Sequence, residues 1–194
     1  FSPKQLFLKP EPFIIHFHGT FIPLQGVKYI IEAAEILKND NIIFRLVGDG
    51  QEYKEMKIFA QEKKLTNIEC TGKKPYSEIP EYISMAHVCL GIFGHTQKAK
   101  RVIPNKVYEY VAMGKPVITS DTSAIREVFT QGKNMIFCNL ADGRSIASAI
   151  IFLKSKPELS SRIGTSAREL FVSRLSSKII GEDLLNNLKS NVKR

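Results

Sequence analysis

The residues most able to do chemistry lie between positions 94 and 116. No acidic residue occurs from Ile83 to Tyr108, whereas Lys98, Lys100, Arg101 and Lys106 in that range are basic. A helical pattern starts near Asn105 and ends at Gly114, with Pro116 just beyond. Asn105 is a good N-cap residue. A helix N-terminus with a lysine in its first turn attracts anions, so this segment predicts an anion site.

Glu109 follows Lys106 by about one helical turn and would be the lone carboxylate near this anion site. A carboxylate does not bind phosphate, but it accepts hydrogen bonds from vicinal hydroxyl groups such as those of a ribose. A phosphate site and a hydroxyl acceptor one turn apart indicate nucleotide binding. A capped surface helix with a solvated Glu109 is the alternative interpretation of the same residues.

Short apolar segments that alternate with amphipathic helical patterns must position these residues. The apolar segments are mostly continuous runs of Ile, Val and Phe, as expected for strands buried on both faces. We predict strands at 13–18, 42–47, 68–71, 88–93, 116–120 and 135–138. We predict helices at 27–37, 52–63, 79–86, 106–113, 123–129 and 144–153. This alternation predicts an α/β fold with a Rossmann-like, doubly wound parallel sheet of about six strands.

Residues 157–194 form two further helical patterns, with more basic than acidic residues. No repeat or linker interrupts the chain, so we expect one domain over 1–194, with 157–194 as its helical tail. Ligands of such sheets bind at the carboxyl ends of the strands. We therefore expect the site in the loops that follow the strands.

The overall charge favours an anionic partner. Twenty-eight basic and nineteen acidic residues give a net charge of +9, which suits nucleotide phosphates, an acidic lipid surface or nucleic acid. Nucleic acid is disfavoured because residues 95–107 contain no aromatic side chain for bases to stack on. The three cysteines, Cys70, Cys89 and Cys138, have no metal-binding spacing, and we expect reduced thiols in a cytoplasmic protein.

Several enzyme classes are excluded by missing motifs. The chain has no GxxxxGK[ST], GxSxG or HExxH, which removes P-loop NTPases, α/β-hydrolase-type serine hydrolases and zincins. The glycine pair at 48–50 lacks the third glycine of a dinucleotide fingerprint. His16 and His18 share one strand face, but they lack ligand partners in sequence, so we interpret His18 as a packed strand-end residue and not as a metal ligand.

Residues 104–118, PNKVYEYVAMGKPVI, resemble the P-[SN]-K-x-x-E-x-x-A-x-G-K-P-V-I signature of retaining family 4 glycosyltransferases. The resemblance runs in order from residue 13 to about 155. It includes the strand and glycine turn at 17–27, the strand-G-x-G element at 44–50 and the segment at 119–134. The chain is similar to the C-terminal, donor-binding half of these two-domain enzymes. The fold implied is one half of a GT-B fold with C-terminal helices.

The resemblance implies a function and a set of site residues. The function is transfer of a sugar, of hexosyltransferase type, from a nucleoside diphosphate sugar to a glycan or lipid-linked acceptor. Glu109 would hold the ribose hydroxyls, and Lys106 would face the diphosphate. The donor-binding residues implied are Gly19, Thr20, Lys73, Lys74, His95, Pro104, Asn105, Lys106, Val107 and Glu109. The candidate catalytic residues are Lys106, Glu109 and Arg101.

Three positions depart from the family pattern. Arg101 stands where the family commonly has the first Glu of E-x7-E, and Thr20 and Gln25 replace the usual diphosphate-binding cations of the glycine turn. We expect Lys98, Lys100, Arg101 and Lys106 to supply that charge from the other side. The sequence has no D-x-D pair, so we expect a metal-independent enzyme with no cofactor beyond the donor.

The resemblance also implies partners. The acceptor-binding half is absent, so we expect a piece of a longer protein that binds donor and transfers little alone. The basic tail suits an anionic membrane surface, which would place the protein peripherally at the inner face of the membrane. A non-catalytic nucleotide-sugar-binding module and a GT-B nucleotide-sugar 2-epimerase are the alternatives, and the P-N-K-x-x-E run favours the transferase. The sequence does not distinguish whether the donor carries UDP, GDP or ADP.

Overall fold

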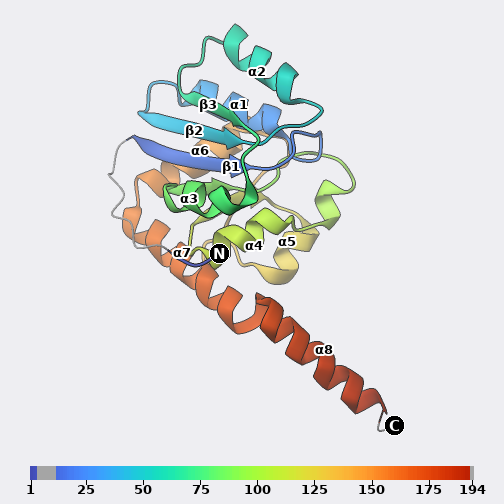
Figure 1. Ribbon diagram of the computed structural model, residues 1–194. Coiled ribbons are helices and arrows are strands. Elements are labelled where there is room, and N and C mark those ends of the chain that lie inside the picture. The colour runs from blue at the N-terminus through green and yellow to red at the C-terminus, as the bar shows by residue number, and fades with distance from the viewer. Residues whose placement is uncertain (4–11, 193–194) are drawn as a thin grey trace.

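Six short parallel strands form the centre of the molecule. The computed structural model describes residues 1–3 and 12–192 (Figure 1). The sheet has the order β3-β2-β1-β4-β5-β6, and every neighbouring pair is parallel. The strands are β1 (Phe13–His18), β2 (Ile42–Val47), β3 (Ile68–Gly72), β4 (Val88–Leu90), β5 (Val117–Ser120) and β6 (Ile136–Cys138). The order reverses between β1 and β4, which is the point where doubly wound sheets bind ligands.

Helices follow each strand, as the alternation predicts. The α-helices are α1 (Val27–Ile36), α2 (Tyr53–Glu62), α3 (Ile79–Ser84), α4 (Asn105–Ala112), α5 (Ser123–Val128), α6 (Gly143–Lys154), α7 (Pro157–Leu170) and α8 (Ser177–Val192). Short turns of other helix types are η1 (Tyr76–Glu78), η2 (Ala99–Arg101) and η3 (Phe171–Leu175). The predicted α/β fold is confirmed, and most element ends lie within two residues of the prediction.

The fourth strand is shorter than predicted. It ends at Leu90, three residues before the predicted end at residue 93. The amide of Gly91 still bonds to the Ile118 carbonyl, but that of Phe93 bonds to the Gln25 carbonyl beyond β1. Ile92 still accepts a hydrogen bond from the Ser120 amide of β5, so only Phe93 is held by the turn that contains Gln25, a difference that a hydrophobicity pattern does not distinguish.

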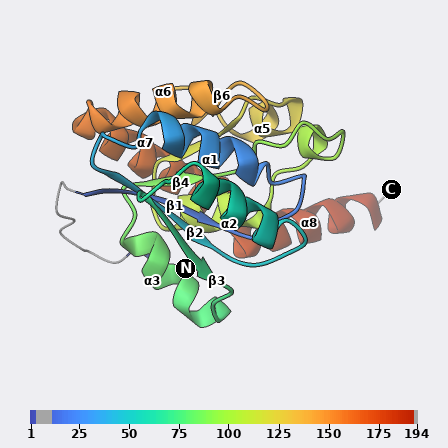
Figure 2. The same cartoon turned by 90° about the horizontal axis from the view of Figure 1, so that it is seen from above.

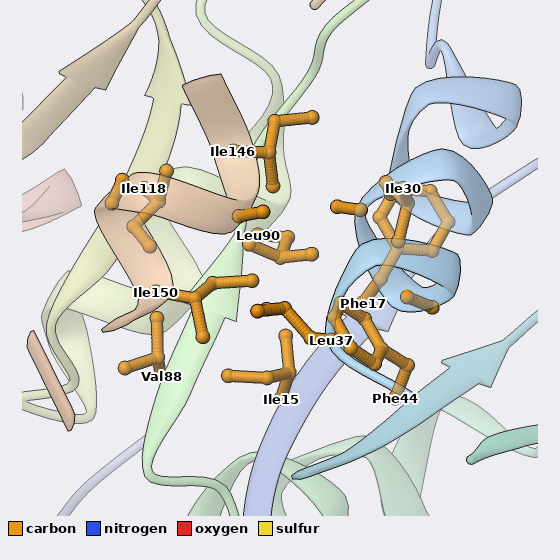
Figure 3. Packing of buried hydrophobic residues seen from close by; sticks show 14 of the residues in the cluster. Ile15, Phe17, Ile30, Leu37, Phe44, Val88, Leu90, Ile118, Ile146 and Ile150 are labelled. Atoms are coloured by element: carbon orange, nitrogen blue, oxygen red, sulfur yellow. The ribbon is translucent and has the colours of Figure 1, made fainter. Parts of the chain in front are cut away.

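The two faces of the sheet have separate cores. On one face, Ile15, Phe17 and Leu90 pack with α1 and α6 (Figure 3). On the other face, Val117 and Cys89 pack with side chains of α3, α4, α5 and α7. Figure 2 shows helices on both sides of the strands. Because side chains alternate along a strand, β1 places Ile15 and Phe17 in the first core and His16 in the second.

The helical tail has one packed and one exposed part. Helix α7 packs against α4, and the Arg168 guanidinium donates a hydrogen bond to the Ala112 carbonyl. Helix α8 extends away from the rest of the molecule (Figure 1). Its side chains Ile180, Leu184 and Leu188 are more than half exposed. The prediction of two helices after residue 157 is confirmed.

Three further features concern the cysteines, metal-binding groups and membrane-spanning helices. Cys89 and Cys138 are buried and Cys70 is half-buried, and all three are free thiols. Within residues 1–3 and 12–192, no group of three or more His, Cys, Asp or Glu side chains could hold a metal ion. None of the helices in this part of the chain is long and apolar enough to cross a membrane.

Candidate functional site

A cavity of about 540 Å³ lies at the carboxyl ends of the first three strands. The loops after β1, β2 and β3 and the start of η1 form its walls. Its lining residues are His18, Gly19, Thr20, Val47, Gly48, Asp49, Lys73, Lys74, Pro75, Tyr76 and Ile79. This cavity is in the loops that follow the strands, where the site is expected. Gly19, Thr20, Lys73 and Lys74 lie together in its lining, as the family resemblance implies.

Two glycines let the strand ends approach each other closely at this cavity. Gly48 has φ +140°, and a Cβ added to it would lie 1.9 Å from the Gly19 carbonyl oxygen. A side chain at position 48 would therefore need the backbone to move. Gly19 has φ +152°, a conformation that favours glycine. The turns after β1 and β2 consequently present bare backbone to the cavity.

Lys106 lies beneath the glycine turn. Its side chain is buried, and its Nζ donates a hydrogen bond of 2.5 Å to the Gln25 Oε1. The same Nζ lies 3.6 Å from the centre of the Phe17 ring. A Cβ added to Gly19 would lie 3.1 Å from this atom. Burial lowers the pKa of Lys106 well below its usual value, and the charge of Glu109 opposes that shift only in part.

The start of α4 differs from the prediction. Asn105 is the first helical residue, and Pro104, with an extended backbone, is the N-cap. The prediction that Asn105 caps the helix is therefore wrong. The Val107 amide donates to the Pro104 carbonyl, and no side chain makes a capping hydrogen bond. The helix ends as predicted, with Gly114 at φ +69° directly after the C-cap Met113.

Glu109 accepts two hydrogen bonds through its carboxylate. His18 Nε2 lies 2.7 Å from Glu109 Oε2, and the Tyr76 hydroxyl donates to Oε1 at 2.8 Å. Partial burial acts to raise the pKa of Glu109, but the hydrogen bonds from His18 and Tyr76, together with the nearby charges of His18 and Lys106, leave the pKa below its usual value. Burial lowers the pKa of His18 more than Glu109 raises it. The lowered pKa of His18 favours a neutral imidazole beside the Glu109 carboxylate near neutral pH.

Tyr76 stands between two cavities. It lines the cavity described above and a second one of about 440 Å³, which also contains Asn105, Tyr108 and Glu109. The predicted site residues are thus divided, because Gly19, Thr20, Lys73 and Lys74 lie in the first cavity whereas Asn105 and Glu109 lie in the second. The two sets meet at Tyr76, whose hydroxyl contacts Glu109.

His95 and Arg101 lie outside the linings of both cavities. The His95 Nδ1 is 3.4 Å from the hydroxyl of Tyr29, on α1. Arg101 ends η2 and is exposed. This turn contacts α5, where the Ser123 hydroxyl donates to the Lys100 carbonyl.

Three residues that contact Lys106 or Glu109 were not predicted from the sequence as site residues. Gln25, noted only as a missing cation, accepts the hydrogen bond of Lys106. His18 and Tyr76 donate to Glu109. The His-x-His spacing was the available signal for His18, because it places both rings on the face of β1 that α4 covers. No local pattern marks Tyr76 or Gln25.

Comparison with known proteins agrees with this architecture. Residues 1–170 match the family described as Glycosyl transferases group 1. The chain belongs to this family. An uncharacterized glycosyltransferase of Methanocaldococcus jannaschii is 25% identical over 160 residues, which cover 79% of this chain and 41% of that protein. The chain spans less than half of the length of the curated relatives that it matches.

Solved glycosyltransferase structures share the fold. The C-terminal domain of a glycosyl transferase group 1 family protein, LpcC of Francisella tularensis, superposes with a TM-score of 0.78 at 19% identity, covering 91% of this chain and 96% of that one. Anabaena HepE, in complex with UDP and glucose, has a TM-score of 0.78 at 16% identity, covering 92% of this chain and 48% of HepE. The predicted half of a GT-B fold is confirmed.

Proposed function

We propose that this chain is the donor-binding part of a retaining, metal-independent glycosyltransferase. Its substrate would be a nucleoside diphosphate sugar, held at the carboxyl ends of β1 to β3. The observation that carries the proposal is the position of Lys106: its buried Nζ lies 3.1 Å from where a Cβ on Gly19 would be, and Gly19 lines the cavity. Membership of the glycosyl transferases group 1 family and the UDP bound by HepE support it.

The proposed chemistry is electrostatic. When the sugar leaves, negative charge accumulates on the diphosphate, and a fixed cation beside open backbone amides stabilises it without reorganisation. Lys106 is held by Gln25 and Phe17, so its position is set before the ligand arrives. A diphosphate at the glycine turn would add to the partial counter-charge of Glu109, and it would raise the pKa of the Lys106 ammonium.

Glu109 is proposed to bind the ribose. It is ionised, and it lies on the same helix as Lys106. Ribose hydroxyls are donors that an ionised carboxylate accepts. Tyr76 occupies Glu109 Oε1 in this structure, so we propose that the ribose displaces the Tyr76 hydroxyl. Lys73 and Lys74 line the cavity wall where the nucleobase is proposed to lie.

The proposal also assigns roles to the other residues that were predicted to bind the donor. Pro104, Asn105 and Val107 form the helix start that would face the diphosphate. Arg101 and His95 are proposed to meet the donor from the loop after β4 once the second half of the enzyme is present. We propose that residues 1–194 form one domain, with 157–194 as its tail.

The partners follow from the same proposal. An acceptor-binding half would complete the transferase and bring a glycan or a lipid-linked acceptor. We propose that the protein works in the cytoplasm, with its tail helices against an anionic membrane surface. Sedimentation with vesicles that contain phosphatidylglycerol, compared with vesicles of phosphatidylcholine alone, tests the last point. Equal binding to both would contradict it.

The first test of the proposed function is nucleotide binding. Thermal unfolding with UDP, GDP, ADP and NAD, each at millimolar concentration, measures which ligand stabilises the chain. A ligand at about 100 times its Kd adds about 2.7 kcal/mol to the free energy of unfolding. We expect a rise in Tm with one nucleoside diphosphate and none with NAD. No rise with any of the three diphosphates would contradict the proposal. Binding without transfer after addition of an acceptor-binding half would favour the non-catalytic module.

A further inference from the structure

A line of hydrogen bonds runs from the buried strand β1 to the Glu109 carboxylate. His16 Nε2 lies 3.0 Å from His18 Nδ1, and His18 Nε2 lies 2.7 Å from Glu109 Oε2. His16 is completely buried, and His18 is at the edge of the larger cavity. Neither histidine is among the site residues that the family resemblance implies.

The Glu109 carboxylate at the end of this line determines which ring nitrogens carry protons. The Glu109 carboxylate only accepts hydrogen bonds, so the proton between it and His18 must be on His18 Nε2. In a neutral imidazole the other nitrogen is then an acceptor, so His16 must donate from Nε2 to His18 Nδ1. This leaves His16 Nδ1 as an acceptor. That buried atom has no hydrogen-bond partner in the described part of the chain.

The surroundings of the two rings keep this arrangement fixed. The His16 ring lies 6.4 Å from the Tyr82 ring of α3 and 5.8 Å from the Tyr110 ring of α4, measured between ring centres. The His18 ring meets the edge or face of Tyr110 at 5.0 Å, and the His18 amide donates to the Tyr110 hydroxyl at 3.1 Å. Burial lowers the pKa of His16 well below its usual value, so the line stays neutral up to the carboxylate.

A buried polar atom without a partner costs stability. An apolar residue at position 16 would avoid that cost and fill the same space between two tyrosines. His16 therefore lowers the stability of the folded chain, but it provides a hydrogen-bond donor that holds His18 in one tautomer. The other oxygen of Glu109 is bound differently, because its donor Tyr76 is 65% exposed and can move away. One carboxylate oxygen is anchored and the other is exchangeable.

We propose that His16 and His18 are positioning residues that hold the Glu109 carboxylate in one orientation, with Oε1 open to the hydroxyl groups of a ribose. This inference rests on the proposed function, because it assigns the exchangeable oxygen to a nucleotide. His18 acts directly on Glu109. His16 acts through His18 by fixing its tautomer.

The tautomers can be measured without any nucleotide. In the chain labelled with ¹⁵N at histidine, long-range ¹H–¹⁵N spectra at pH 7.5 distinguish protonated from unprotonated ring nitrogens. We expect His16 and His18 both to carry the proton on Nε2. His87 is an internal reference, because its Nδ1 accepts a hydrogen bond of 2.9 Å from the Ile14 amide. A proton on Nδ1 of either His16 or His18 would overturn the inference.

Nucleotide affinity tests the positioning role. The probes are UDP and 2′,3′-dideoxy-UDP, with the guanosine and adenosine pairs measured alongside. We expect His18→Phe to weaken binding of the ribonucleotide about tenfold or more, from the loss of a hydrogen bond to a charged group. Binding of the dideoxy form should not change, because it has no hydroxyls for Glu109. His16→Phe should give a smaller loss with the same selectivity, and His18→Gln, which keeps an N–H donor, should restore part of it.

A matched control separates positioning from packing. Tyr82→Phe changes the side chain that packs on His16 and keeps the hydrogen bonds of the line intact, so it should leave both affinities unchanged. Equal losses for the ribonucleotide and the dideoxynucleotide in His18→Phe would overturn the proposal, since they indicate a general structural effect. If the wild-type chain binds no nucleoside diphosphate, the proposed function fails. The tautomer spectra then decide separately whether the line of hydrogen bonds exists.

Discussion

Lys106 and Glu109 lie one turn apart on α4, and their surroundings are opposite. Lys106 is buried, and the neutral Gln25 amide is its hydrogen-bond acceptor. Glu109 is partly exposed and accepts from His18 and Tyr76. The pKa of each group is lowered, which disfavours the charge of Lys106 and favours the charge of Glu109.

These opposite surroundings indicate which part of the site contributes most to ligand affinity. A buried ammonium without a counter-charge is destabilising, and an anionic ligand relieves that cost. The carboxylate is already satisfied, so a ligand at Glu109 must exchange one hydrogen bond for another. We therefore expect the phosphate side of the site to dominate affinity and the Glu109 side to provide selectivity.

Lys106→Met should have the largest effect on binding. We expect the affinity for UDP, or whichever nucleoside diphosphate binds, to fall by roughly 3 kcal/mol, about a hundredfold, because a charged hydrogen-bond donor is lost. The affinity for the corresponding nucleoside should hardly change. Isothermal titration calorimetry measures both. Lys28→Met, an exposed lysine on α1, is the control, and equal losses for diphosphate and nucleoside would contradict the assignment.

The stability of the chain should depend on pH through Lys106. Its pKa in the folded chain is below the unfolded value of about 10.5, so between these two values the unfolded chain binds the extra proton. The free energy of unfolding should then rise with pH by up to about 1.4 kcal/mol per pH unit in that window. Urea unfolding at pH 7 to 10 should show this rise in wild type and a smaller one in Lys106→Met. Parallel curves would contradict the buried-cation description.

Glu109→Gln should remove an acid-sensitive contribution. The folded pKa of Glu109 is lowered, so its contribution is complete above the unfolded value of about 4.5 and is lost as the pH falls through the folded value. We expect wild type to exceed the variant by about 1–2 kcal/mol at pH 6. The difference should shrink below pH 4.5. Chemical unfolding across pH 3–6 measures it, and a difference independent of pH would contradict the ionised state.

Tyr76→Phe should have the smallest effect, and it should strengthen binding. The Tyr76 hydroxyl competes for Glu109 Oε1, so its removal should raise the affinity for the ribonucleotide by a few-fold, or about 0.5–1 kcal/mol. The dideoxynucleotide should not gain. Titration calorimetry with both compounds measures this. A weaker ribonucleotide affinity would mean that Tyr76 contributes to the bound state and does not need to leave.

Residues 88–93 show what an apolar sequence pattern predicts correctly and what it does not predict. The apolar run correctly predicted a buried strand after α3. Its last residue, Phe93, instead donates its amide hydrogen bond to the turn that contains Gln25. Asn105 gives a similar lesson, because a residue that often caps helices can equally be the first helical residue when Pro104 provides the extended position.

The alternation of strands and helices, and with it the parallel sheet and the edge that carries the cavity, could be predicted from local sequence patterns. The placement of Lys106 and Glu109 on one helix could also be predicted, because periodicity and helix-end signals are local. The groups that these two side chains contact depend on the tertiary structure. Gln25 lies 81 residues from Lys106, and His18 lies 91 residues from Glu109. Burial and these distant partners set the pKa values and orientations, and the pairing of β1 with β4 brings them close to α4.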